Sequence, residues 1–216
     1  MRLDRAQKIA QEIIKMLEDY CIRVEIGGSI RRKKAEVKDI EIVYISKMVP
    51  LQVAMFDEED TMSPVMDGRV MSLVQDGVLQ WDRITFRNGP KYKRLIHVES
   101  GMVVELFRAT EKNWGAIYAL RTGDAGFSKL LVTATWSGGA MPAGMRMQHG
   151  HLWRMGFPLE SHTETEFFSQ LRLPWIKPEN RNAETLRRYL KHNVTRVVPA
   201  VLGFGGHGVK AHGSGC

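Results

Sequence analysis

The spacing of apolar side chains changes several times along the first fifty residues. Residues 4–19 repeat apolar side chains at helical spacing, which predicts an amphipathic helix. Residues 22–26 alternate apolar and charged side chains, which predicts a half-buried strand that ends at the glycine pair Gly27-Gly28. A second strand is predicted over 39–45. The chain is thus expected to open as helix, strand, glycine turn and strand.

The pattern that follows predicts the rest of a mixed sheet. Residues 67–77 are expected to form a helix, and 84–87 and 94–98 a hairpin around an Asn-Gly-Pro turn. A further strand is predicted over 102–107. Residues 1–109 therefore form one expected lobe, a mixed sheet with flanking helices.

Helical spacing returns at Thr110 and marks a second, smaller α+β lobe over 110–181. Two helices are expected there, separated by Thr122-Gly123-Asp124. The glycine- and proline-rich residues 138–144 predict a surface loop. A last segment, 182–216, is expected to contain a short basic helix over 183–192 and a loose glycine-rich tail.

Composition narrows the class of protein. With 216 residues and 44% hydrophobic side chains, the chain can bury a hydrophobic core that needs no stabilisation by disulfide bonds or bound metal. The net charge of +7 favours an anionic partner, nucleic acid first and a phosphorylated small molecule second. Two cysteines suggest no disulfide framework, and no apolar run approaches the length of a membrane span. We expect no signal peptide and an intracellular location, cytoplasmic in a bacterial or viral setting.

Three carboxylates are the strongest candidates for chemistry. Asp39 and Glu41 lie two apart on a predicted strand, so they project from the same face, and Glu105 lies on a later strand. Neighbouring carboxylates repel each other, and a hard cation such as Mg²⁺ or Mn²⁺ relieves that repulsion. The acidic face therefore outlines a metal site. The plain alternatives are a solvated acidic face and a Glu105 that pairs with a neighbouring arginine.

The turn before the acidic pair is suited to phosphate. Glycine at position 28 permits a close backbone approach, Ser29 offers a hydroxyl, and Arg32, with Arg31 beside it, adds positive charge. An ordinary turn with a solvated basic run is the alternative. The order of a Gly-Ser turn, an acidic pair ten residues later and a third acid on another strand favours the phosphate interpretation.

These motifs, in this order, resemble those of the family X DNA polymerases, the relatives of DNA polymerase beta within the nucleotidyltransferase superfamily. The resemblance spans about residues 5–181 and rests on these motifs: Gly28-Ser29-Ile30-Arg31-Arg32, Asp39-Ile40-Glu41, Glu105, Trp114-Gly115-Ala116, Thr122-Gly123-Asp124, and the closing segment from Glu164 to Arg181. It implies a nucleotidyltransferase-type palm over 1–109 followed by a nucleotide-binding lobe over 110–181.

The resemblance also implies roles and partners. Asp39, Glu41 and Glu105 would be catalytic and would bind two Mg²⁺ ions, with Mn²⁺ able to substitute. Nucleotide contacts would come from Gly28, Ser29, Arg32, Thr122, Gly123, Ser128 and Lys129. The expected reaction is template-directed addition of a deoxynucleotide to a DNA primer 3′ hydroxyl, in DNA repair or replication, by a monomer without the family's lyase lobe.

Several positions depart from the family pattern. Glu41 and Glu105 stand where the polymerases carry Asp, and Ser128 stands where an Asn often contacts the nucleotide. DNA affinity would come from the basic clusters 91–94 and 187–191, whose tyrosines either stack on bases or pack against the protein. Two alternatives stay open: transfer to RNA, a protein hydroxyl or a small molecule, and a non-catalytic DNA-binding relative.

Overall fold

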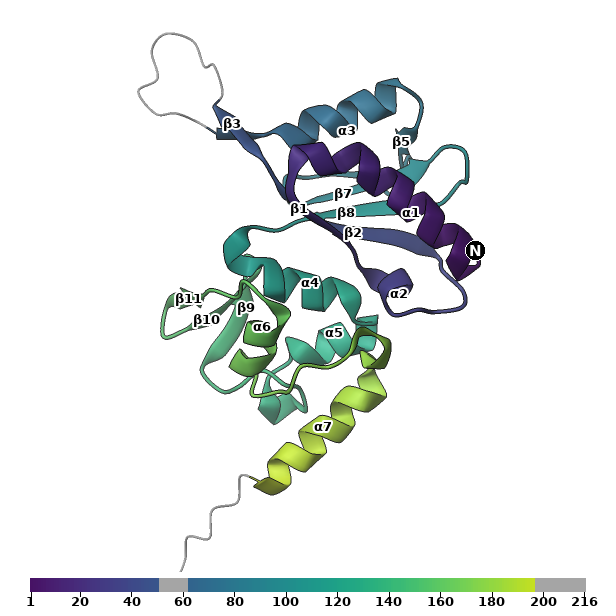
Figure 1. Cartoon of the computed structure of the whole chain (residues 1–216). Helices are drawn as coiled ribbons and strands as arrows, with labels where there is room; N and C mark the ends of the chain where they lie inside the picture. The colour runs from purple at the N-terminus through teal and green to yellow at the C-terminus, as the bar shows by residue number, and fades with distance from the viewer. Residues whose placement is uncertain (51–61, 197–216) are drawn as a thin grey trace, which may run out of the picture.

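The computed structural model describes residues 1–50 and 62–196, and these form two lobes (Figure 1). The first lobe contains the elements α1 (Leu3–Leu17), β1 (Cys21–Ile26), α2 (Gly28–Arg31), β2 (Asp39–Ser46), β3 (Met48–Pro50), β4 (Met62–Pro64), α3 (Val65–Gln75), β5 (Leu79–Trp81), β6 (Arg87–Asn88), β7 (Tyr92–His97) and β8 (Val103–Arg108). The second contains α4 (Trp114–Thr122), α5 (Ala125–Leu131), β9 (Met145–Gln148), β10 (His151–Arg154), β11 (Phe157–Leu159), α6 (Glu164–Gln170) and α7 (Ala183–Arg196). Short 3₁₀ turns lie at Glu18–Tyr20, Glu111–Asn113, Thr135–Ser137 and Pro178–Asn180.

The main sheet of the first lobe is mixed, in the order β1-β2-β8-β7-β5, with β6 also paired to β7. Strands β2 and β8 are parallel, and the other pairs are antiparallel. Helices flank this sheet, which confirms the predicted α+β class.

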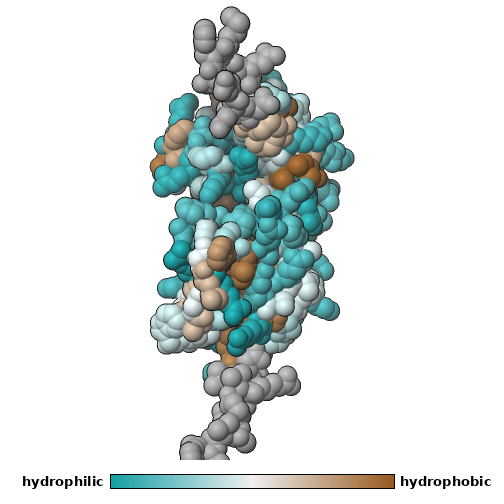
Figure 2. All heavy atoms as spheres, turned by 90° about the vertical axis from the view of Figure 1, so that its left-hand side faces the viewer, coloured by the Kyte–Doolittle hydropathy of each residue, from teal (hydrophilic) through white to brown (hydrophobic). Residues whose placement is uncertain are grey.

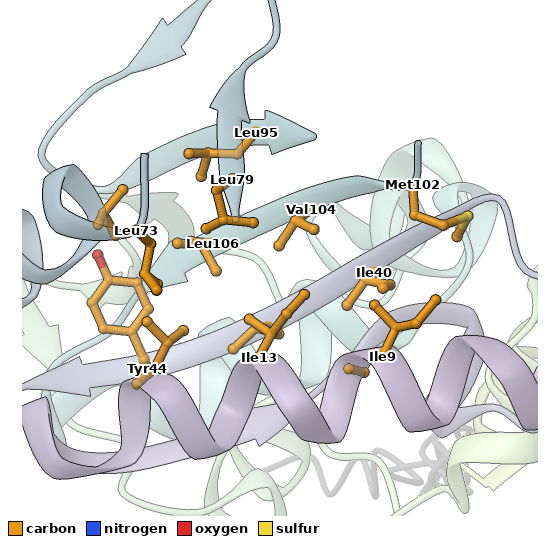
Figure 3. Packing of buried hydrophobic residues seen from close by; sticks show 14 of the residues in the cluster. Ile9, Ile13, Ile40, Tyr44, Leu73, Leu79, Leu95, Met102, Val104 and Leu106 are labelled. Carbon is orange, nitrogen blue, oxygen red and sulfur yellow. The ribbon is translucent and has the colours of Figure 1, made fainter. Parts of the chain in front are cut away.

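The core of the first lobe lies between the sheet and two helices. Ile9 and Ile13 of α1 face Ile40 of β2 and Val104 of β8 (Figure 3). All four side chains are buried, because residues two apart on a strand share a face, and Ile40 and Ile42 of β2 and Val104 and Leu106 of β8 make that face apolar. The odd-numbered face of the same strands is left for the second lobe and for the acids.

The second lobe has its own core. Helices α4 to α7 and the β9–β11 sheet surround Phe127, Phe167 and Phe168, all fully buried. Leu186 of α7 is buried in the same cluster, so this helix packs on the second lobe. The expected helix over 183–192 thus extends to Arg196, and residues 197–216, which include the predicted loose tail, lie outside the described residues.

The predicted hairpin around Asn88-Gly89-Pro90 is present, but its first strand is much shorter than expected. Of the expected strand over 84–87, only Arg87 lies in a strand, the two-residue β6 (Arg87–Asn88). The C-terminal half of β7, from Leu95 to His97, pairs with β5 instead. Asp82 explains the difference, because its Oδ1 accepts hydrogen bonds from the backbone N–H groups of Ile84 (2.9 Å) and Thr85 (3.0 Å). This Asx-type turn diverts the backbone into an exposed loop.

The surface and the cysteines agree with the composition. The face in Figure 2 is mostly hydrophilic, with hydrophobic residues in small separate patches. Cys21 is a buried free thiol, and Cys216 lies outside the described residues. None of the helices in the described ranges is both long and apolar enough to cross a membrane.

Candidate active site

The three predicted carboxylates share one face of the central sheet. Asp39 and Glu41 are on β2, and in the parallel register Glu41 is the direct partner of Glu105 on β8. All three are half-buried, on the odd-numbered face that packs toward α4. Residues 64 positions apart in sequence thus come to adjacent strands of one surface.

Burial and mutual repulsion disturb the ionisation of this face. Burial, with Asp39 and Glu105 adding to it, raises the pKa of Glu41 to about 7. Burial, followed by the charge of Glu105, also raises the pKa of Asp39. Arg32 lies close enough to oppose both shifts, but it does not cancel them. A cation added between the carboxylates would favour their charged forms.

The donor set therefore suits a hard divalent cation, but the side chains are not gathered around one. Within residues 1–50 and 62–196 no three His, Cys, Asp or Glu side chains lie close enough together to hold a metal ion.

Glu105 is held by two residues of the neighbouring strand β7. Its Oε1 accepts from the hydroxyl of Tyr92 (2.5 Å) and from Nη1 of Arg94 (2.6 Å). Arg94 is itself anchored, since its Nε donates to Oδ2 of Asp82 (2.8 Å). The ion pair that we gave as the alternative role of Glu105 is therefore present.

The predicted phosphate turn contains two polar atoms that lack partners. Oγ of Ser29 and Nε of Arg32 are buried and make no hydrogen bond with any described residue. Buried polar groups normally have hydrogen-bond partners, so two unpartnered atoms beside the Gly27-Gly28 turn call for a partner from outside the protein. One oxyanion with several acceptor oxygens could satisfy both.

The turn is fitted closely against the acidic pair. Gly28 has φ +57°, and a Cβ at this position would lie 1.9 Å from Oε2 of Glu41. The N–H of Gly27 donates to the carbonyl of Glu41 (2.8 Å). Only glycine permits this approach, so the turn and Glu41 form one unit.

The two arginines of the basic run are partly buried and bonded within the protein, whereas Lys33 and Lys34 are exposed. Arg31 donates from Nη1 to Oε1 of Glu164 (2.6 Å) and from Nη2 to Oε2 (2.7 Å), a bidentate pair across the two lobes. Arg181, which is fully buried, donates to the same carboxylate. Although burial opposes it, the two guanidinium groups lower the pKa of Glu164 to about 2. This triad joins the phosphate turn to α6.

The residues that the resemblance assigned to the nucleotide lie near this junction. Thr122 is fully buried, its Oγ1 accepts from Arg31 (2.6 Å), and its carbonyl accepts from Nη1 of Arg32 (2.6 Å). Gly123 ends α4, and a Cβ there would meet the ring of Phe127 at 2.4 Å.

The two remaining predicted residues lie on α5. The hydroxyl of Ser128 donates to the carbonyl of Leu120 (2.6 Å), so this donor is already used within the lobe. Lys129 is exposed and open to solvent. Asp124, which takes the place of the family's serine, caps α5 by accepting from the N–H of Phe127 (2.7 Å).

The basic cluster 91–94 is mostly engaged inside the protein. Lys93 is buried and pairs with Asp67 (3.0 Å), and Arg94 is bound as described above. Tyr92 stacks on Phe107, with ring centroids 4.9 Å apart. Of this cluster only Lys91 is exposed, so it supplies less charge for DNA than the sequence suggested.

A cavity of about 460 Å³ opens beside the acidic face. Tyr92 and Phe107 line it from the first lobe, and Arg121 and His149 line it from the second. The Arg121 guanidinium lies 3.9 Å from the centre of the Phe107 ring. The walls of this cavity are aromatic and basic, and Tyr92, which donates to Glu105, connects them to the acidic face.

Comparison with known proteins identifies one part of the chain. Residues 138–182 match the family model described as the DNA polymerase beta thumb. This stretch includes Glu164 and Arg181, and so contributes two members of the ion triad. No curated protein sequence matches the chain. The resemblance to family X polymerases is therefore supported over the second half of the second lobe.

Proposed function

We propose that this protein is a metal-dependent nucleotidyltransferase that adds deoxynucleotides to the 3′ hydroxyl of a DNA primer, directed by a template, and releases pyrophosphate. The thumb match supports a polymerase-like function and DNA as the partner. The observation that carries the proposal is the pair of unpartnered buried atoms, Ser29 Oγ and Arg32 Nε, beside three carboxylates on one sheet face.

The carboxylates of Asp39, Glu41 and Glu105 would hold Mg²⁺ or Mn²⁺, and a bound ion would supply charge neutralisation for the triphosphate and for the leaving pyrophosphate. In the reaction the primer 3′ oxygen bonds to the α-phosphorus, the bond to pyrophosphate breaks, and the hydroxyl loses its proton. Glu105 would orient that hydroxyl, as the third acid does in the family it resembles.

The chain's own residues would bind and place the triphosphate. Ser29 would donate its hydroxyl and Arg32 its Nε–H to phosphate oxygens, with the Gly28 backbone close by. Because Arg32 already holds the carbonyl of Thr122, a phosphate bound at Nε would touch a residue fixed to the second lobe. Lys129, exposed on α5, would approach the base.

Primer extension tests the function directly. The full chain is incubated with labelled primer-template, dNTPs and Mg²⁺ or Mn²⁺, beside Asp39→Ala and the control Glu99→Ala, which removes an exposed acid outside the site. We expect extension by the natural chain and the control, and a loss of about a hundredfold or more in Asp39→Ala. Equal extension by all three would refute the proposal.

The phosphate turn has its own test. Ser29→Ala and Arg32→Gln are expected to raise the KM for the incoming nucleotide more than they lower kcat, since they remove binding contacts. Labelled nucleotide found only on RNA, protein or a small molecule would identify a different acceptor. Intact DNA binding without nucleotide binding under any metal would instead favour a non-catalytic relative.

A further inference from the structure

The cation nearest to Glu105 belongs to the protein itself. Arg94 donates to Oε1 of Glu105, and it is shared with Asp82, which comes from the loop after β5. The three side chains are 24%, 14% and 8% exposed in the order Arg94, Glu105 and Asp82, so the pairs are sheltered from solvent. A positive charge thus already lies where the acidic face would attract one.

The two carboxylates on Arg94 differ in freedom. Asp82 is tied down, because its Oδ1 accepts two backbone N–H groups while its Oδ2 faces Arg94. Within the described part of the chain Glu105 is held at Oε1 alone, by the side chains of Tyr92 and Arg94, so it is restrained less than Asp82. If Glu105 leaves, Arg94 keeps a charged partner.

This arrangement opposes a divalent ion in two ways. It occupies Oε1 of Glu105 with two donors, and within the described residues no three His, Cys, Asp or Glu side chains are gathered closely enough to hold a metal ion. It also leaves a guanidinium in direct contact with a carboxylate that would bind the ion, and like charges repel strongly in a sheltered site.

We propose that Arg94 is an internal counter-ion that sets the metal affinity of the acidic face: it holds Glu105 in the resting site, and it withdraws to Asp82 alone when a divalent ion binds Asp39, Glu41 and Glu105. The proposal rests on the metal-dependent function proposed above. It assigns Arg94 and Asp82 as positioning residues that act through Glu105.

The test measures Mn²⁺ binding to the full chain by electron paramagnetic resonance, without substrate. Arg94→Gln keeps a polar side chain near Asp82 but removes the charge. Arg87→Gln is the matched control, because Arg87 is the strand partner of Arg94 on β6, its side chain is exposed, and that side chain donates to the carbonyl of Phe86 and not to the acids. Arg94→Gln should bind Mn²⁺ about tenfold more tightly than the natural chain, and Arg87→Gln within about twofold of it.

A second variant reverses the sign. Asp82→Asn retains an oxygen for the turn at Ile84 but leaves Glu105 as the only charged partner of Arg94, so Mn²⁺ should bind more weakly than to the natural chain. Opposite shifts in two variants of one network cannot both come from loss of folding. Unchanged or weaker Mn²⁺ binding by Arg94→Gln would overturn the inference.

Failure of the inference differs from failure of the function. If the natural chain binds Mn²⁺ and Asp39→Ala does not, while Arg94→Gln behaves as the natural chain does, the metal site stands and the role of Arg94 is refuted. If no variant binds Mn²⁺ at all, both proposals are refuted.

Discussion

Replacement of Glu164 by Gln should destabilise the fold, because Glu164 is the buried anion that two guanidinium groups share. The carboxylate is 8% exposed and accepts from Arg31 and from the fully buried Arg181. Glu164→Gln keeps the shape but leaves two guanidinium groups without their anion. Removal of one partner from a buried ion pair usually costs about 3–5 kcal/mol, because the remaining charge is uncompensated.

The pKa of Glu164 gives a second estimate of the same quantity. Its fall from 4.5 to about 2 corresponds to roughly 3 kcal/mol, at about 1.4 kcal/mol per pKa unit. Because the folded-state pKa is lowered, this stability is present above about pH 4.5 and is lost as the pH falls toward 2. The two estimates agree on about 3 kcal/mol.

Urea unfolding at pH 7 and at pH 3 measures both effects. Glu160→Gln is the control, since Glu160 lies in the same lobe and forms an exposed pair with Lys112 (2.8 Å), a kind of pair that contributes about 0–1 kcal/mol. Glu164→Gln should lose about 3 kcal/mol at pH 7 and much less at pH 3. A loss below about 1 kcal/mol at pH 7, similar to the control, would refute the reasoning.

Three further changes test other parts of the structure. Gly28→Ala should destabilise by about 2 kcal/mol or more, because its Cβ would meet Glu41 at 1.9 Å with φ +57°; a neutral result in thermal unfolding would contradict this close approach. The pKa of Glu41 is raised to about 7, so the folded state favours its protonated form. The natural chain without metal should therefore lose up to roughly 3 kcal/mol of unfolding free energy as the pH rises from about 4.5 to 7. Glu41→Gln should flatten this profile, although Asp39, Glu105, Arg32 and Arg121 still face the site. Leu186→Ala should cost about 2–5 kcal/mol in urea unfolding if α7 belongs to the second core, and almost nothing if the helix is only loosely attached.

The sequence predicts those parts of the site that depend on local geometry. The two-residue period of a strand puts Asp39 and Glu41 on one face whatever the rest of the fold, and the apolar residues between them identify the opposite face as the core side. The period cannot say which strand lies beside β2. The pairing of Glu41 with Glu105 follows from the parallel register of β2 and β8, which the structure supplies.

Contacts between distant segments were missed for the same reason. Arg31 and Glu164 are 133 positions apart, and neither carries a local pattern that points to the other. The contact of Arg94 with Glu105 was easier to predict from the sequence. Arg94 and Tyr92 lie on the same face of β7 because they are two residues apart, and both lie opposite the segment that contains Glu105. A register drawn between β7 and β8 would have found both partners of Glu105. Asp82 was missed because its turn replaced a predicted strand.

The Glu residues that depart from the family pattern need to be judged with their neighbours. A shorter Asp at position 105 would end one methylene sooner, and the contacts of 2.5 Å to Tyr92 and 2.6 Å to Arg94 would be lost unless β7 moved closer. The longer side chain therefore accompanies two partners that use its length. Under the counter-ion proposal, Glu105 needs enough length both to bond Arg94 and to join Asp39 and Glu41 around an ion, and a side chain one methylene shorter would lose the first of these contacts. If the proposed function holds, a Glu at position 105 would therefore change how the site is controlled and would keep its chemistry.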